Sequence, residues 1–116
     1  KDYLEKNADT VGVFLEELLK TWSDINKNPA SIADMREEYG LLKDLPKDLE
    51  KEIVPYYETG AQGGQFPKDG GGAAAAKSDF EFYSVAGQIK GDPASLKVED
   101  FWYLEPLNAA LKKVGM

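Results

Sequence analysis

The chain has 116 residues, the length of one domain, and such a domain can bury roughly two thirds of its unfolded surface. Its formal net charge of −7 argues against nucleic-acid binding, because phosphate contacts need clustered Lys and Arg side chains. It has no cysteine and no histidine, which excludes thiol chemistry, disulfides, Cys/His zinc sites and Ser-His-Asp catalysis. No run approaches the ~18 consecutive apolar residues of a membrane span.

The first predicted element is a long amphipathic helix at residues 7–28. Asn7 can cap its first amide groups, and Asp9 lies in the first turn, where the helix dipole favours a negative charge. Asn28-Pro29 should end the helix, because proline disfavours helical geometry in the residue before it. Apolar residues recur at helical spacing and predict one face in need of a cover: Val11, Phe14, Leu15, Leu18, Leu19, Trp22 and Ile25.

Two further helices are expected in the middle of the chain. Ser31 and Asp34 resemble a capping box, which predicts a second helix that ends near Gly40. Pro46 suits the first position of a third helix. Pro55 should kink this helix or stop it early, because an interior proline costs about 3 kcal/mol. The apolar side of the third helix would hold Leu49, Ile53, Tyr56 and Tyr57.

Residues 59–77 are rich in glycine and alanine and predict a loop, with Phe66 as its only large apolar anchor. Residues 73–76, all alanine, can belong to this loop or extend the helix that follows. No strand precedes the glycines, and neither the P-loop nor the dinucleotide-binding spacing is met, so a phosphate cradle is not indicated. The segment is expected to be a flexible connection or a loop beside a ligand cleft.

The C-terminal helices are expected within residues 78–116. Ser78 and Glu81 form a capping box, which predicts the start of a fourth helix, and Pro106 and Gly115 suit the ends of the last one. Together these patterns predict an all-α chain of about five helices with one Gly-rich loop, forming a single helical domain or fragment over residues 1–116. The apolar face of the fourth helix would hold Phe82, Val85, Ala86 and Ile89.

No residue pattern predicts catalysis. The paired carboxylates are neighbours in sequence, such as Glu16-Glu17 and Glu37-Glu38, and helical neighbours point about 100° apart, so we expect a solvated face. No alternating loop of oxygen ligands predicts a metal site, and no cofactor is expected. Tyr56, Tyr57 and Phe66 are candidate ligand-binding residues because they flank or lie in the Gly-rich loop; core packing is the alternative role.

Two stretches of the chain together resemble a known family. One runs from Tyr3-Leu4-Glu5-Lys6-Asn7-Ala8-Asp9-Thr10-Val11 through Trp22 to Ile25-Asn26-Lys27-Asn28-Pro29, where a long helix follows a capping Asn. The other is Phe82-Tyr83-Ser84-Val85-Ala86-Gly87-Gln88-Ile89-Lys90, followed by Val98-Glu99-Asp100-Phe101-Trp102 and Leu107-Asn108-Ala109-Ala110-Leu111-Lys112-Lys113-Val114-Gly115. This pattern is similar to the C-terminal part of periplasmic solute-binding proteins of ABC importers, in the nitrate/sulfonate/taurine-type family.

The resemblance implies the C-terminal helical part of a two-lobe α/β binding protein, which lies in the periplasm and delivers a small anion to an ABC permease without catalysis. Because the sequence begins at Lys1 and not at Met, we expect a processed or excised product. A fragment of this kind would bind anions weakly or not at all and would self-associate through an exposed apolar face. The alternative is a self-standing acidic α-helical module that docks on a partner protein.

Overall fold

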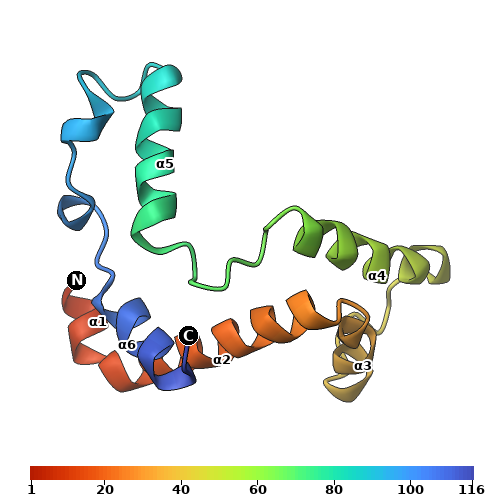
Figure 1. Cartoon of the computed structure of the whole chain (residues 1–116). Coiled ribbons are helices and arrows are strands. Elements are labelled where there is room, and N and C mark those ends of the chain that lie inside the picture. Colours follow the sequence, from red (N-terminus) through yellow and green to blue (C-terminus); the bar gives the residue numbers. More distant parts are fainter. The chain divides into compact units, whose positions relative to one another are not determined.

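The computed structural model describes residues 1–116 and consists of helices joined by turns and loops, without a β-strand (Figure 1). The expectation of an all-α chain is confirmed. The α-helices are α1 (Asp2–Lys6), α2 (Ala8–Lys27), α3 (Ser31–Glu38), α4 (Lys47–Gln62), α5 (Gly72–Val85) and α6 (Glu105–Val114). Two short 3-10 turns, η1 (Pro93–Ser95) and η2 (Val98–Asp100), lie between α5 and α6.

The chain divides into two compact units. The first unit comprises Lys1–Leu19 and Asp69–Met116, and the second comprises Lys20–Lys68. The division therefore falls inside α2, whose first half belongs to one unit and whose second half belongs to the other. Each unit holds its own set of packed side chains.

Helix α2 forms as the sequence predicts, but its apolar face is only partly covered. Leu19 and Ile25 are buried, whereas Phe14 is 64% exposed, which contradicts its predicted inward position. Phe14 lies about 140° around the helix from Leu19, at the margin of the apolar face. Side chains at such a margin are buried only where a neighbouring element reaches around the helix, and none covers Phe14. The remaining members of the face are half-buried: Val11, Leu15, Leu18 and Trp22.

In the second unit, Arg36 ties the turn after α3 to α4. Its Nη2 atom donates to the Glu50 carboxylate at 2.7 Å and to the Leu42 carbonyl at 3.2 Å, and its Nε donates to the Leu41 carbonyl at 3.2 Å. Leu42 has a φ of +53°, the only non-glycine residue in the left-handed region. Arg36 therefore fixes a turn whose backbone carries a local conformational cost.

Helix α4 continues through Pro55 to Gln62, so the predicted early stop is wrong. Pro55 lacks the N–H that would bond to the Lys51 carbonyl. Both residues are exposed, so water can reach the freed carbonyl group. In addition, the Thr59 hydroxyl donates to the Pro55 carbonyl at 2.9 Å. Access of water to the Lys51 carbonyl group reduces the cost of the proline at this surface position.

The starts of α3 and α5, and the loop before α5, differ from the sequence expectation. Helix α3 has Ala30 as its N-cap residue without a side-chain cap, and the Ser31 hydroxyl has no hydrogen-bond partner. Helix α5 begins at Gly72, so Ser78 lies inside it and donates to the Ala74 carbonyl at 3.4 Å. Alanine has the highest helix propensity, which explains the extension of α5 over the alanine run. The loop shortens to residues 63–71 instead of 59–77.

The first unit has a small core where α5 packs on the irregular segment that contains η1 and η2, and Figure 1 shows the two running side by side. Ala76, Phe80 and Val98 are buried at its centre. Phe82 and Val85, predicted to face inward, are 67% and 92% exposed, so that prediction is wrong. The buried face of α5 passes through Ala76 and Phe80, one helical turn apart. Ile89, Leu96, Trp102 and Leu104 pack around this core.

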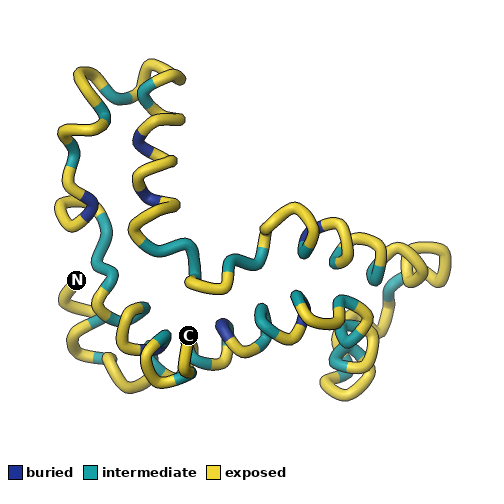
Figure 2. Tube along the Cα trace, in the orientation of Figure 1, coloured by how far each residue is buried: buried dark blue, intermediate teal, exposed yellow.

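Helix α6 ends as its sequence predicts, with Gly115 in the left-handed region at φ +74°. Glycine populates this region without a Cβ clash, which makes it the usual residue after a helix. Figure 2 shows that most of the trace is exposed or half-buried. No helix combines the length and the apolar character needed to cross a bilayer. The buried apolar residues are Leu19, Ile25, Ala76, Phe80, Val98 and Ala110.

Candidate functional site

The three residues that the sequence offers as ligand contacts lie together in the second unit. The Tyr57 and Phe66 rings are stacked, with centroids 5.8 Å apart and an interplanar angle of 14°. Tyr56 meets Tyr57 edge-on at 5.4 Å, and Trp22 lies 6.5 Å from Phe66. Aromatic pairs at these distances add about 0.5–1.5 kcal/mol beyond the area that they bury.

Phe66 is held in this cluster by its neighbours. The Asn26 side-chain amide donates to the Phe66 carbonyl at 2.6 Å. A Cβ atom on Gly60 would lie 3.1 Å from the Phe66 ring, so the glycine allows the ring to approach α4 closely. The Tyr57 and Phe66 rings stack face to face, as residues that pack together do. The Tyr56 side chain, in contrast, is 65% exposed. The geometry thus gives Tyr57 and Phe66 a packing contact and leaves only Tyr56 open to solvent.

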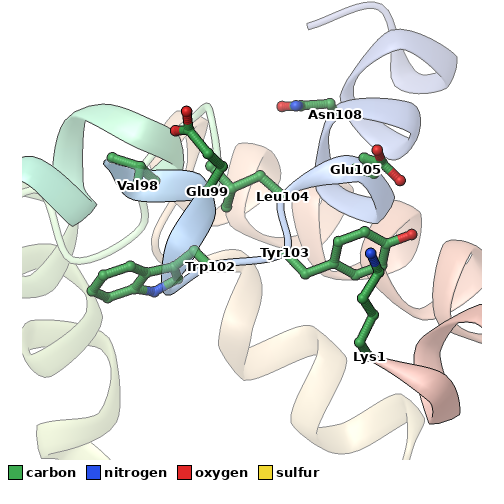
Figure 3. A pocket seen from close by; sticks show the side chains of 8 residues that line it. All are labelled: Lys1, Val98, Glu99, Trp102, Tyr103, Leu104, Glu105 and Asn108. Carbon is green, nitrogen blue, oxygen red and sulfur yellow. The ribbon is translucent and has the colours of Figure 1, made fainter. Parts of the chain in front are cut away.

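A concave site lies in the first unit, between the start of α1 and the segment from η2 to α6 (Figure 3). Its volume is about 390 Å³. This is within the lower part of the range for small-molecule pockets. The lining residues are Lys1, Val98, Glu99, Trp102, Tyr103, Leu104, Glu105 and Asn108.

Trp102 and Tyr103 are adjacent in the irregular segment between η2 and α6, but their rings have different partners. The Trp102 ring meets the buried Phe80 ring edge-on at 5.3 Å, so the core of the first unit fixes it. Figure 3 shows the Trp102 and Tyr103 rings directed to opposite sides of the backbone between them. The Tyr103 ring lies beside Glu105, and the Lys1 ammonium lies over its face, 5.2 Å from the ring centroid.

The charges of the pocket act on Tyr103. A side-chain hydrogen bond with Glu105 raises the pKa of the Tyr103 phenol, and desolvation and the nearby carboxylate charges raise it further. Two carboxylates, Glu99 and Glu105, line the pocket with one side-chain ammonium, that of Lys1, so the side chains of the lining have a net charge of −1.

The sequence did not identify this pocket as a site. Trp102 and Tyr103 are consecutive aromatic residues, but nothing in the sequence brings Lys1 to them from the opposite end of the chain. Only the proximity of Glu105 to Tyr103 could have been expected from the sequence, since Glu105 lies two positions after Tyr103 at the start of α6. Pocket residues that come from distant segments can be recognised only when the chain is folded.

No group of three or more His, Cys, Asp or Glu side chains is gathered in an arrangement that could hold a metal ion. The pocket offers hydrogen-bond acceptors, aromatic faces and negative charge, which are the means of binding a ligand. Comparison of the chain with protein-family models, with curated proteins and with solved structures finds no match.

Proposed function

We propose that the chain is the helical C-terminal portion of a periplasmic substrate-binding protein that delivers a small anion to an ABC importer. The support for this proposal comes from the two stretches that resemble the nitrate/sulfonate/taurine-type family. In that arrangement α2 is the long helix that returns the chain to a lobe, and α5 and α6 close the tail. The function involves no catalysis: two lobes close around nitrate, a sulfonate, taurine or a similar anion.

One observation favours this proposal over other helical roles: large apolar side chains are exposed on several elements. Val13 and Phe14 project from α2, and Phe82 and Val85 project from α5, all more than half exposed. Large apolar side chains left in water on several helices suit faces that another protein surface covers. The cover in the proposed protein is an α/β lobe. The substrate itself would contact that lobe and its partner, which is why the tail alone should not bind anions.

The proposal makes two measurements decisive. The reading frame immediately upstream of Lys1 should encode two α/β lobes, and the product of that complete frame should bind nitrate, taurine or an alkylsulfonate in a calorimetric titration. The 116-residue chain alone should give no heat of binding with the same anions. Micromolar binding by the 116-residue chain, or an upstream sequence without α/β lobes, would contradict the proposal.

A second candidate is a self-standing acidic α-helical module that docks on a partner protein. It is favoured by the Ala76, Phe80 and Val98 core, because the first unit has buried contacts of its own. The two candidates differ in solution behaviour. A tail that lacks its lobe should self-associate through the exposed faces of α2 and α5, whereas a complete module should be a monodisperse monomer in size exclusion with light scattering. Phe14→Glu combined with Val85→Glu should restore the monomer in the first case and change nothing in the second.

A further inference from the structure

The pocket of the first unit already contains a bound cation that belongs to the chain itself. The Lys1 ammonium lies 5.2 Å from the centroid of the Tyr103 ring, within the ~6 Å at which a cation is attracted to an aromatic face. Figure 3 shows this ammonium against the ring, with the Glu105 carboxylate on the same side of the pocket. The aromatic face and the carboxylate are therefore arranged as a receptor for positive charge.

Lys1 holds this position only loosely. Its side chain is 65% exposed, and its one ion pair, with Glu5, has a distance of 3.8 Å between Nζ and Oε1. Exposed ion pairs of this kind contribute little to stability. A soluble cation can therefore compete with Lys1 for the same ring without disturbing the fold.

The opposite side of the contact is built on the core of the first unit. Trp102, the residue before Tyr103, packs edge-on against the buried Phe80 ring at 5.3 Å, and Figure 3 shows the Glu105 carboxylate beside the Tyr103 ring. A segment that is anchored before binding loses less freedom when a ligand arrives. When the Lys1 side-chain ammonium leaves, the lining retains the Glu99 and Glu105 carboxylates and no cationic side chain, which gives its side chains a net charge of −2.

We propose that this pocket binds a small organic cation, a primary or quaternary ammonium compound, whose charged group replaces the Lys1 ammonium over the Tyr103 ring. Glu99 and Glu105 supply the counter-charge, and the Asn108 side chain, which Figure 3 shows on the same rim, offers a hydrogen-bond partner for a hydroxyl or amino substituent. The site is separate from the anion site proposed for the complete protein and does not depend on it. Its ligand has the opposite charge, so the failure of either proposal leaves the other standing.

The test is a nuclear magnetic resonance titration of the ¹⁵N-labelled 116-residue chain with choline chloride, in which choline replaces sodium at constant ionic strength. The chain has two tryptophans, so the indole N–H of Trp102 reports on the pocket and that of Trp22, in the other unit, is an internal control. We expect saturable shifts of the Trp102 indole and of the Tyr103 amide, with the Trp22 indole unchanged. The neutral carbon isostere of choline, 3,3-dimethylbutan-1-ol, should not produce them, because it lacks the charge.

Variants separate the aromatic and the electrostatic contributions. Tyr103→Leu should weaken choline binding about fivefold, the loss expected for one cation–π contact. Lys1→Ala should strengthen it about two- to fivefold, because the competing ammonium is removed. Tyr83→Leu, on an exposed tyrosine of the same unit outside the pocket, is the matched control and should leave binding unchanged. If Tyr103→Leu disturbs folding, Glu105→Gln provides the second weakened variant.

The proposal is overturned by any of three results. The first is the absence of a saturable shift at the pocket with choline. The second is that the neutral isostere causes the same shifts as choline. The third is that Lys1→Ala weakens binding instead of strengthening it. The last result would mean that Lys1 builds the site and does not compete for it.

Discussion

The burial of Phe80 can be tested directly against the exposure of Phe82, two positions away on α5. Phe80 is 3% exposed and its ring lies 5.3 Å from the rings of both Phe101 and Trp102, whereas Phe82 is 67% exposed. Phe80→Ala removes a buried aromatic side chain, which costs about 3–5 kcal/mol. The core of the first unit is small and lies near the surface, so it can partly collapse around the cavity. We therefore expect the lower end, about 3 kcal/mol.

Phe82→Ala is the matched control, with the same change of residue on the same helix. Its side chain is mostly in water already, so we expect a loss below about 0.5 kcal/mol. Urea unfolding followed by circular dichroism at 222 nm gives both free energies, and the Trp102 indole signal shows whether the first unit has lost its structure. If Phe80→Ala leaves no folded baseline, Phe80→Leu should retain the fold at a cost of about 1 kcal/mol.

The reasoning is refuted if Phe82→Ala destabilises the chain as much as Phe80→Ala. That outcome would place the apolar face of α5 where the sequence pattern put it, through Phe82 and Val85. Equal and negligible effects of both substitutions would refute it as well, because they would mean that α5 does not pack on the η1–η2 segment at all.

Three further outcomes are expected. Arg36→Ala should lower the free energy of unfolding by about 1–2 kcal/mol in urea melts, because the 19%-exposed side chain bonds to the Glu50 carboxylate and to two carbonyl groups of the turn. Leu42→Gly should raise the melting temperature, since glycine relieves the left-handed backbone at a gain of about 1 kcal/mol. The hydrogen bond with Glu16 raises the pKa of Lys113 above its ordinary 10.5. The contact therefore stabilises the fold fully below that ordinary pKa and is lost as the pH rises through the higher folded-state pKa. Glu16→Gln should flatten this alkaline part of the stability profile in melts recorded from neutral to strongly alkaline pH.

Much of the secondary structure could be predicted because its causes are local. The helical spacing of apolar residues located α2, and Pro106 with Gly115 located α6, since a helix needs a tolerant first residue and a left-handed residue after its end. The start of α5 could not be settled by such signals. A capping box at Ser78 competes with an alanine run that favours helix, and the two effects have similar free energies.

The candidate site was accessible to prediction only in part. Tyr57 and Phe66 do meet, as their positions on either side of one short turn allow, but their stacked rings show a packing contact. The pocket around Tyr103 needs Lys1 from the start of the chain and Glu105 from near its end. No periodicity or spacing relates such distant positions.

The sequence by itself therefore determined that the chain is helical, where most helices lie, and that nothing in it supports Cys or His chemistry. The tertiary structure decided which apolar residues are buried, placing Phe80 inside and Phe14, Phe82 and Val85 outside. It also brought an ammonium and an aromatic ring together from opposite ends of the chain. The physical reason is that helix formation depends on residues within a few positions of one another, whereas burial and pockets depend on which distant segments pack together.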